Sequence, residues 1–384
     1  MSVRMGEDNV TPGQSSTPLT AANQRVVDHI ERILRDIVTD IDVSSGRRPV
    51  ITLRRISAIV PYYDRIDPAC LRWHIEDREV RYHFPGKTKE EAWRFEERPS
   101  FIAEGTIANV SRDIYYHDPD LFRQQETVDR YIDDIAHTFQ VTRSALNVAS
   151  SPKGLMVGFS TTHERIHTAL VPEDLAAEHE FADISHLKWV LVVEKEATFK
   201  SLAERECYQS PVVGPGLLVT AKGYPDLSTR RFLRIILDRA EGTVPVFGLF
   251  DWDPDGVRIM KCYRYGSRAM AQEYHCNLPE IEWIGLKAQD VADLSDFDDT
   301  STVLSMRDRA LALSMLTNRE WRDRSGTVLP GLDMALEELR RMLMLNRKAE
   351  IQILDERRGG LENWLTARLS DELQVHDDDD MMLV

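Results

Sequence analysis

The chain has 384 residues, of which 42% are hydrophobic and 29% are charged. A chain of this length and composition builds two or three folded domains and is not disordered throughout. No apolar run approaches the roughly 20 residues of a membrane span, and four dispersed cysteines without a C-x-x-C pair predict neither a disulfide framework nor a zinc knuckle. We therefore expect a protein of the cytosol or nucleus.

The net charge of −16 opposes nucleic-acid binding on average, because Lys and Arg side chains supply most of the non-specific affinity for phosphate. Six of the acids lie after Arg368, which is the last Lys or Arg of the chain. Residues 369–384 are therefore predicted to be a solvated acidic tail. Basic clusters elsewhere can still contact DNA.

The first 49 residues are predicted to form a tail and a helix. Residues 1–19 are rich in Ser, Thr, Gly and Pro and are expected to be disordered. Within residues 20–49, apolar side chains recur at helical spacing from Val26 to Ile41 and predict an amphipathic helix with a wide apolar face. That face can pack on the chain's own first domain or contact a partner subunit.

Residues 50–165 are predicted to form a winged-helix domain. Apolar residues at helical spacing from Val128 to Phe139 mark a helix, and a shorter helical piece precedes it. Two apolar runs, 146–149 and 155–157, then flank a turn and predict a hairpin. Two helices followed by a hairpin indicate a winged helix, which is a helix-turn-helix variant that places side chains against DNA.

The middle of the chain, residues 180–300, alternates apolar runs with helical segments. This rhythm predicts an α/β domain with a parallel sheet, in which ligands bind outside the carboxyl ends of the strands. Residues 301–368 are predicted to be mostly helical. The predicted strands are Trp189–Val193, Leu217–Thr220, Val244–Phe250 and Ile281–Leu286.

Three acids stand at the carboxyl ends of two predicted strands: Glu194 follows the first strand, and Asp251 and Asp253 follow the third. Carboxylates gathered in this way predict a site that suits Mg²⁺. An EF-hand is excluded because Cys262 stands where that loop requires a bidentate Glu. A phosphatase-type aspartyl nucleophile and simple helix capping stay open, and capping is favoured for Asp255.

Several tracts occur in an order and spacing that is unlikely to arise by chance. They are Ser111–Tyr116, Ser151–Leu155, Val193–Phe199, Ala221–Arg230 and Asp251–Gly256. Together they resemble the topoisomerase VI A-subunit family, and in detail they are most similar to its eukaryotic branch, the meiotic double-strand-break transesterases. The resemblance implies a winged-helix DNA-binding domain of the 5Y-CAP type followed by a Toprim α/β domain.

The resemblance also implies a tyrosine nucleophile. The family's nucleophile is the second residue of a Tyr-Tyr pair, here Tyr116, whose phenol oxygen would attack a DNA phosphate and form a 5′-phosphotyrosyl link. A phenol is mostly protonated at neutral pH and needs an activator. Arg112 lies one helical turn before Tyr116 and could stabilise the phenolate or the charge on the phosphate. Tyr115 is also within side-chain reach of Arg112, so spacing alone prefers Tyr116 only modestly.

Four basic residues are predicted to contact DNA. Lys153 is expected at the tip of the wing, and Lys222, Arg230 and Arg231 lie between two strands of the Toprim domain. These cations would contact phosphate without reading sequence. Ordinary surface charge is the alternative for each of them. The family usually has Gly-Lys-Gly where this chain has Ala221-Lys222-Gly223.

The function implied by the resemblance is a transesterase that makes meiotic double-strand breaks in the nucleus with Mg²⁺. It would act on double-stranded DNA as a homodimer, in which each active site joins the tyrosine of one protomer to the metal site of the other. The expected partners are meiotic accessory proteins and a topoisomerase VI B-like subunit, with no membrane involved. The alternatives are the A subunit of a somatic type IIB topoisomerase with an ATPase B subunit, and a non-cleaving DNA-binding scaffold. Residues 59–80 and 96–110 depart from the family pattern.

Overall fold

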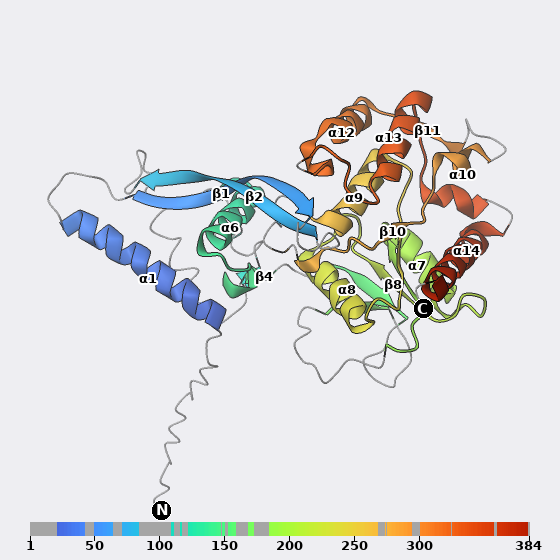
Figure 1. Cartoon of the computed structure of the whole chain (residues 1–384), viewed down its shortest axis with the longest axis horizontal. Coiled ribbons are helices and arrows are strands. Elements are labelled where there is room, and N and C mark those ends of the chain that lie inside the picture. Colours follow the sequence, from blue (N-terminus) through green and yellow to red (C-terminus); the bar gives the residue numbers. More distant parts are fainter. Residues whose placement is uncertain are drawn as a thin grey trace, which may run out of the picture.

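The fold is a mixed α/β architecture with an N-terminal group of elements and a larger α/β unit (Figure 1). The predicted tail at 1–19 and the segment 84–108 lie outside the described residues. The structure, a computed structural model, describes residues 21–42, 50–63, 71–83, 109–110, 116, 122–146, 148–149, 153–158, 168–172, 184–267, 273, 275–293, 300–323, 325–356 and 359–382.

The N-terminal elements share a small apolar core. Helix α1 (Ala21–Asp42) places Val26 in this core, and α6 (Gln125–Phe139) lines it with its apolar face, as the helical spacing predicts. Leu34 and Val38 of α1 are 44% and 57% exposed. The first turns of α1 therefore pack on the chain's own α6, and the predicted partner contact of this helix stays a prediction. The other elements here are β3 (Asn109–Val110), η1 (Ser144–Leu146) and β4 (Val148–Ala149).

A long antiparallel ribbon lies against α6. Its strands are β1 (Val50–Tyr63) and β2 (Leu71–His83), so part of the segment that departs from the family pattern is β-structure. The guanidinium of Arg55 in β1 donates hydrogen bonds to both carboxylate oxygens of Asp134 in α6, at 2.6 to 3.1 Å. Asp134 is 3% exposed. This ion pair therefore joins the ribbon to the helix at a position that solvent hardly reaches.

The larger unit is built on a six-stranded sheet of the described residues, in the order β10-β9-β7-β8-β5-β6. The strands β7 to β10 run parallel to one another where they pair, as predicted. β7, β8 and β9 are buried along their whole length, which is why they read as continuous apolar runs in the sequence. The strands are β5 (Leu155–Val157), β6 (Ala169–Leu170), β7 (Trp189–Val193), β8 (Gly216–Thr220), β9 (Val246–Leu249) and β10 (Glu282–Trp283).

The predicted wing hairpin is wrong in the described residues. β4 pairs in parallel with β3, whereas β5 pairs antiparallel with β8 and β6 and belongs to the central sheet. The apolar run in β5 is only three residues long, and its burial is provided by a neighbour about sixty residues later in the chain. The winged-helix domain is thus not confirmed by strand pairing, and Lys153 lies at the sheet and not at a wing tip.

Crossover helices connect the parallel strands. α7 (Glu196–Glu204) links β7 to β8, α8 (Leu227–Arg239) links β8 to β9, and α9 (Pro254–Tyr265) links β9 to β10. The chain therefore passes from β7 to β8 on one side and returns to place β9 on the other side of β7. This reversal makes the carboxyl ends of β7 and β9 a topological switch point, where open α/β sheets bind their ligands.

The C-terminal part is largely helical, as predicted, and packs on the sheet unit. The predicted acidic tail from residue 369 differs from the structure, because α14 (Gly360–Met382) continues through it and Leu369 is buried. No helix among the described residues combines the length and apolar character of a membrane span. The other elements are η2 (Cys207–Gln209), α10 (Ala288–Ala292), β11 (Thr302–Val303), α12 (Met306–Thr317), η4 (Arg319–Trp321), α13 (Asp333–Leu345), β12 (Arg347–Lys348) and η5 (Ile351–Glu356).

The ion pair between ribbon and helix can be tested by a matched pair of substitutions. Arg55→Ala leaves the Asp134 carboxylate buried without its cation, so we expect a loss of about 2 to 3 kcal/mol in the free energy of unfolding. Arg54→Ala is the control, because the Arg54 guanidinium is 55% exposed and lies 3.7 Å from Asp77. Chemical denaturation of both variants measures the difference. Equal stability of the two variants would show that the pair does not hold the ribbon.

Candidate functional site

The sheet register brings Glu194 to Asp251. Val193, the last residue of β7, pairs with Leu249, the last residue of β9, so both strands end at the same level. Glu194 follows at once, and its Oε2 accepts a hydrogen bond of 2.9 Å from the backbone N–H of Asp251. The predicted neighbourhood of these two acids at the switch point is therefore present in the structure.

Asp251 and Asp253 are each held by backbone N–H groups. Asp251 accepts a bond of 2.8 Å from the N–H of Ile351, which comes from the C-terminal part. Asp253 is the N-cap of α9 and accepts a bond of 2.6 Å from the N–H of Gly256. Capping was expected of Asp255, but Asp253 performs it here, and Asp255 instead pairs with Arg307 at 2.7 Å. A cap uses one carboxylate oxygen and leaves the other available as a ligand.

The three carboxylates influence one another's protonation. Burial, together with the nearby charges of Asp251 and Asp253, raises the pKa of Glu194 to about 8. Burial and the Asp251 charge raise the pKa of Asp253 to about 6, although the Gly256 N–H opposes this. Burial likewise raises the pKa of Asp251, against the attraction of Lys195 and the Ile351 N–H. Raised pKa values are typical of crowded carboxylates that a cation would stabilise in the ionised form.

The donor set fits a hard divalent cation. It consists of carboxylate oxygens alone, which Mg²⁺ prefers. A side chain on Gly256 would come within 3.2 Å of Glu194 Oε2 and 2.6 Å of the Asp251 carbonyl oxygen, so glycine is needed where the backbone passes between two of the acids. The Lys195 ammonium lies 2.7 Å from Asp251 Oδ2 and already supplies one positive charge to the cluster.

A second group of possible ligands does not fit a cation equally well. Among the described residues, Glu273, His275 and Cys276 have ligand atoms within 4.8 Å of one another, a spacing that the three acids of the switch point do not reach. Glu273 supplies the single carboxylate of this group, and the His275 imidazole and the Cys276 thiol are softer ligands than the oxygens that Mg²⁺ prefers. Closeness of ligand atoms alone therefore does not make this group the better candidate.

Two of the predicted DNA contacts lie near the carboxylates. After β8 the chain turns through Lys222 and Gly223, both with positive φ (57° and 98°), and the Gly223 N–H donates to the Glu194 carbonyl oxygen at 2.9 Å. This turn brings Lys222 to the end of β7. Burial lowers the pKa of Lys153, and the nearby Lys222 ammonium lowers it further against the attraction of Asp226. The cationic pair of Lys153 and Lys222 therefore comes from distant parts of the sequence, and its Lys222 ammonium also lies 3.4 Å from Glu196 Oε2.

The other two predicted DNA contacts have structural partners. Arg230 is 0% exposed and donates a hydrogen bond to Asn277, so its guanidinium cannot contact a phosphate on the surface in this conformation. Arg231 is paired with Glu273, which is 1% exposed. Both arginines lie in α8, whose side chains the helical spacing divides between the core and solvent. The expectation of a phosphate contact is therefore wrong for Arg230 in the structure as it stands.

The predicted nucleophile is on the surface. Tyr116 is 64% exposed, and its backbone is helical. Arg112 and Tyr115 lie outside the described residues, so the proposed pairing of Arg112 with Tyr116 stays a prediction. An exposed phenol is accessible to a macromolecular substrate such as DNA.

The role of Lys195 and of the residues that hold it was not predicted from the sequence. Its ammonium contacts Asp251, Glu350 at 2.9 Å and Gln352 at 3.2 Å. Burial lowers the pKa of Lys195, but the hydrogen bonds and charges of Asp251 and Glu350 outweigh it and the net shift is upward. Its place directly after Glu194 is the one signal in the sequence that could have indicated this role.

Comparison with known families matches two parts of the chain. Residues 189–366 match the family model of the Toprim domain shared by Spo11 and the A subunit of topoisomerase 6. Residues 101–148 match the model described as Type IIB DNA topoisomerase. The first match begins at β7 and includes the switch point and most of the C-terminal helices, and the second includes Tyr116.

Curated relatives agree with these matches. The chain is 36% identical to meiotic recombination protein rec12 of Schizosaccharomyces pombe, over 70% of this chain and 74% of that protein. It is 31% identical to meiotic recombination protein SPO11 of Homo sapiens, over 77% and 76%. It is also 31% identical to the protein of that name in Mus musculus, over 90% and 88%. With a Toprim domain whose acids meet at the switch point and relatives of this similarity along most of its length, the chain belongs to the topoisomerase VI A-subunit/Spo11 family.

Proposed function

We propose that this chain is a DNA-cleaving transesterase that makes double-strand breaks in meiotic recombination. The observation that carries the proposal is the contact between Glu194 and Asp251 at the switch point of a Toprim sheet, with Asp253 two residues further along the chain. The proposal is further supported by the relatives, which are named as meiotic recombination proteins. Work on chromosomal DNA implies a place in the nucleus.

In this proposal the three carboxylates hold Mg²⁺. A divalent cation bound there supplies positive charge to phosphate oxygens. Glu194 would give up the proton that its raised pKa retains near neutral pH, whereas Asp253, with a pKa of about 6, is mostly ionised there. Lys195 would keep Asp251 ionised and oriented through the 2.7 Å contact. The role of these residues is therefore to hold a fixed negative site with open positions toward DNA.

The covalent step is assigned to Tyr116. Its phenol oxygen attacks a DNA phosphorus, loses its proton, and forms a 5′-phosphotyrosyl bond while the bond to the 3′ oxygen breaks. The released 3′ hydroxyl takes up a proton, and one ester bond replaces another. Arg112 would stabilise the phenolate or the charge on the phosphate. Because Tyr116 is exposed, DNA can reach it from solvent.

The DNA surface is assigned to residues 101–148 together with Lys153 and Lys222. The match of residues 101–148 to a type IIB DNA topoisomerase model supports a DNA-contacting region there, and its winged-helix class stays a prediction. The two lysines would contact phosphates next to the metal site, where the cation and the ammonium groups act on the same backbone. A homodimer, meiotic accessory proteins and a topoisomerase VI B-like subunit complete the proposed assembly.

The metal site predicts a pH dependence of metal affinity. Because the pKa of Glu194 lies near 8, a metal ion must displace its proton at neutral pH, whereas Asp253, with a pKa near 6, is already mostly ionised there. Affinity should therefore rise between pH 6 and 8, by about tenfold per unit for the one proton displaced. Calorimetric titration of Mn²⁺ into the full chain at several pH values measures it. Glu194→Ala should weaken binding and flatten the profile, whereas Glu204→Gln, at the exposed end of α7, should change neither. A flat profile in the unsubstituted chain would contradict the assignment.

The nucleophile is tested by removing single hydroxyl groups. Tyr116→Phe keeps the ring and should eliminate covalent protein–DNA complexes in meiotic cells, while DNA binding and dimerisation persist. Tyr115→Phe should retain at least partial cleavage. Recovery of Tyr-linked oligonucleotides by immunoprecipitation is the measurement. Reversed effects would move the nucleophile to Tyr115, and complete absence of linked DNA in the unsubstituted protein would favour a non-cleaving scaffold.

The cationic pair is tested by the salt dependence of DNA binding. Lys153→Ala and Lys222→Ala should each weaken binding on all sequences alike and reduce the slope of log affinity against log salt by about 1. Lys188→Ala is the matched control, since Lys188 is exposed and directly precedes β7, at the opposite end of that strand from Glu194. Fluorescence anisotropy with two unrelated duplexes measures the slopes. A loss confined to one duplex would refute a phosphate contact.

The A subunit of a somatic type IIB topoisomerase is the second candidate, favoured by the match at residues 101–148. Both functions use the same cleavage step, and they differ in religation driven by an ATPase subunit. Relaxation of supercoiled DNA in the presence of ATP and a B subunit would support the second candidate over the first.

A further inference from the structure

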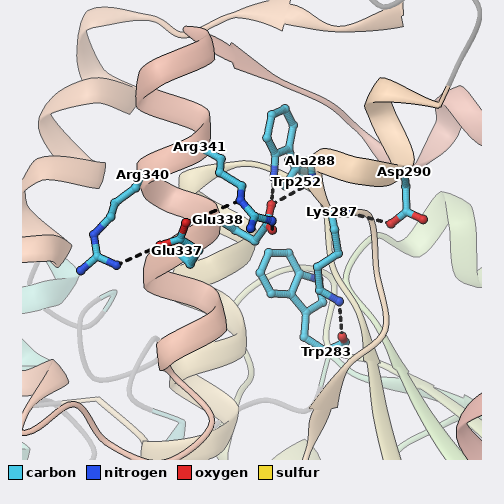
Figure 2. A network of polar contacts seen from close by, with 9 residues as sticks. All are labelled: Trp252, Trp283, Lys287, Ala288, Asp290, Glu337, Glu338, Arg340 and Arg341. Atoms are coloured by element: carbon cyan, nitrogen blue, oxygen red, sulfur yellow. Dashed lines mark hydrogen bonds and ion pairs between the residues drawn. The ribbon is translucent and has the colours of Figure 1, made fainter.

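A buried carboxylate lies behind the metal loop. Glu338 of α13 is 1% exposed. Its Oε2 accepts two hydrogen bonds, from the indole Nε1–H of Trp252 at 2.7 Å and from the backbone N–H of Ala288 at 2.8 Å. Its Oε1 pairs with Arg341 at 2.7 Å. Figure 2 shows this network, in which the Glu338 carboxylate lies between Arg341 on one side and Trp252 and Ala288 on the other.

Trp252 connects this network to the candidate metal site. It stands between Asp251 and Asp253 in the chain and is 0% exposed. Its backbone N–H and carbonyl both pair with Ala349, at 3.0 Å each. The residue is therefore fixed at its backbone and at its indole, and any shift of Trp252 moves the two neighbouring aspartates with it.

The hydrogen bond from the Trp252 indole restricts a rotation that the two backbone hydrogen bonds to Ala349 alone would allow. Two hydrogen bonds to Ala349 still allow the short segment to rotate about the line between them, whereas a third bond at the far end of the indole prevents this rotation. The acceptor must be an oxygen, because Trp252 Nε1–H and the Ala288 N–H are two donors that converge on one buried point. A carboxylate oxygen has the lone pairs to accept both.

We infer that Glu338 is a positioning residue for the metal site, which acts through the Trp252 indole to fix the carboxylates of Asp251 and Asp253. This inference rests on the metal site of the proposed function. Groups that orient metal ligands from behind typically change metal affinity by 10–100-fold when they are replaced. Glu338 is one residue further from the ligands, so the lower end of that range applies.

The test measures Mn²⁺ affinity of the full chain by calorimetry at pH 8, together with thermal unfolding. Trp252→Phe removes the indole N–H, and Glu338→Met removes the acceptor at similar length. Each should weaken Mn²⁺ binding by about tenfold. The double variant should bind Mn²⁺ with about the same affinity as the single variant that binds it less tightly, because the two residues act through one hydrogen bond. Glu338→Gln should recover most of the affinity, since its amide oxygen can accept both bonds.

Glu337→Met is the matched control. Glu337 is the preceding residue of α13, its side chain is 49% exposed, and it pairs with Arg340 at 3.2 Å and with Arg341 at 3.7 Å. It should bind Mn²⁺ like the unsubstituted chain. If Glu338→Met does not unfold cooperatively, Trp252→Phe decides alone. Affinity of Trp252→Phe within twofold of the unsubstituted chain, or additive losses in the double variant, would overturn the inference.

Failure of the inference is separable from failure of the proposed function. Glu194→Ala serves as the reference for loss of the metal site. If Glu194→Ala binds Mn²⁺ as well as the unsubstituted chain, the metal site itself is wrong, and the inference falls with it. If Glu194→Ala loses binding while Trp252→Phe retains it, the metal site stands and only the positioning role of Glu338 is refuted.

Discussion

Three carboxylates have to be kept close together in a largely buried place, and the rest of the unit is organised around this constraint. Like charges and loss of water both oppose ionisation, so the acids need partners that do not move. The sheet register provides the Asp251 N–H for Glu194, the start of α9 provides the Gly256 N–H for Asp253, and the C-terminal part provides the Ile351 N–H for Asp251. The acids are thus held by backbone groups of two separate segments, residues 251–256 and Ile351.

The central sheet was predictable because its strands are buried on both faces. Trp189–Val193 was predicted to the residue, since a fully buried parallel strand is apolar at every position. The same reasoning placed Glu194 and Asp251 at one edge, because an acid directly after such a run must stand at the carboxyl end of the strand. The motif around Asp251 indicated a metal site, and the parallel register places the carboxyl ends of β7 and β9 at the same height in the sheet.

The parts that were not predictable depend on contacts between distant residues. β5 reads as half of a local hairpin, yet its partners are β8 and β6. Arg230 was expected to be a surface cation, but it lies on the buried face of α8, where its guanidinium donates a hydrogen bond to Asn277. Charge and spacing along a sequence do not show which face of a helix will be covered. The role of Lys195 was missed for the same reason, since Glu350 and Gln352 lie more than 150 residues away.

The central sheet of the Toprim unit includes β5, although β5 precedes the residues that match the Toprim family model. The family match begins at β7, and a fragment cut there would be a natural choice for expression. Such a fragment would lack β5, which covers the edge of β8, and β6, which pairs with β5. A bare edge of buried, apolar strand is prone to pair with other chains and aggregate. A soluble fragment of this unit therefore has to begin before Leu155, and an exchange of Toprim units between relatives has to carry that earlier segment with it.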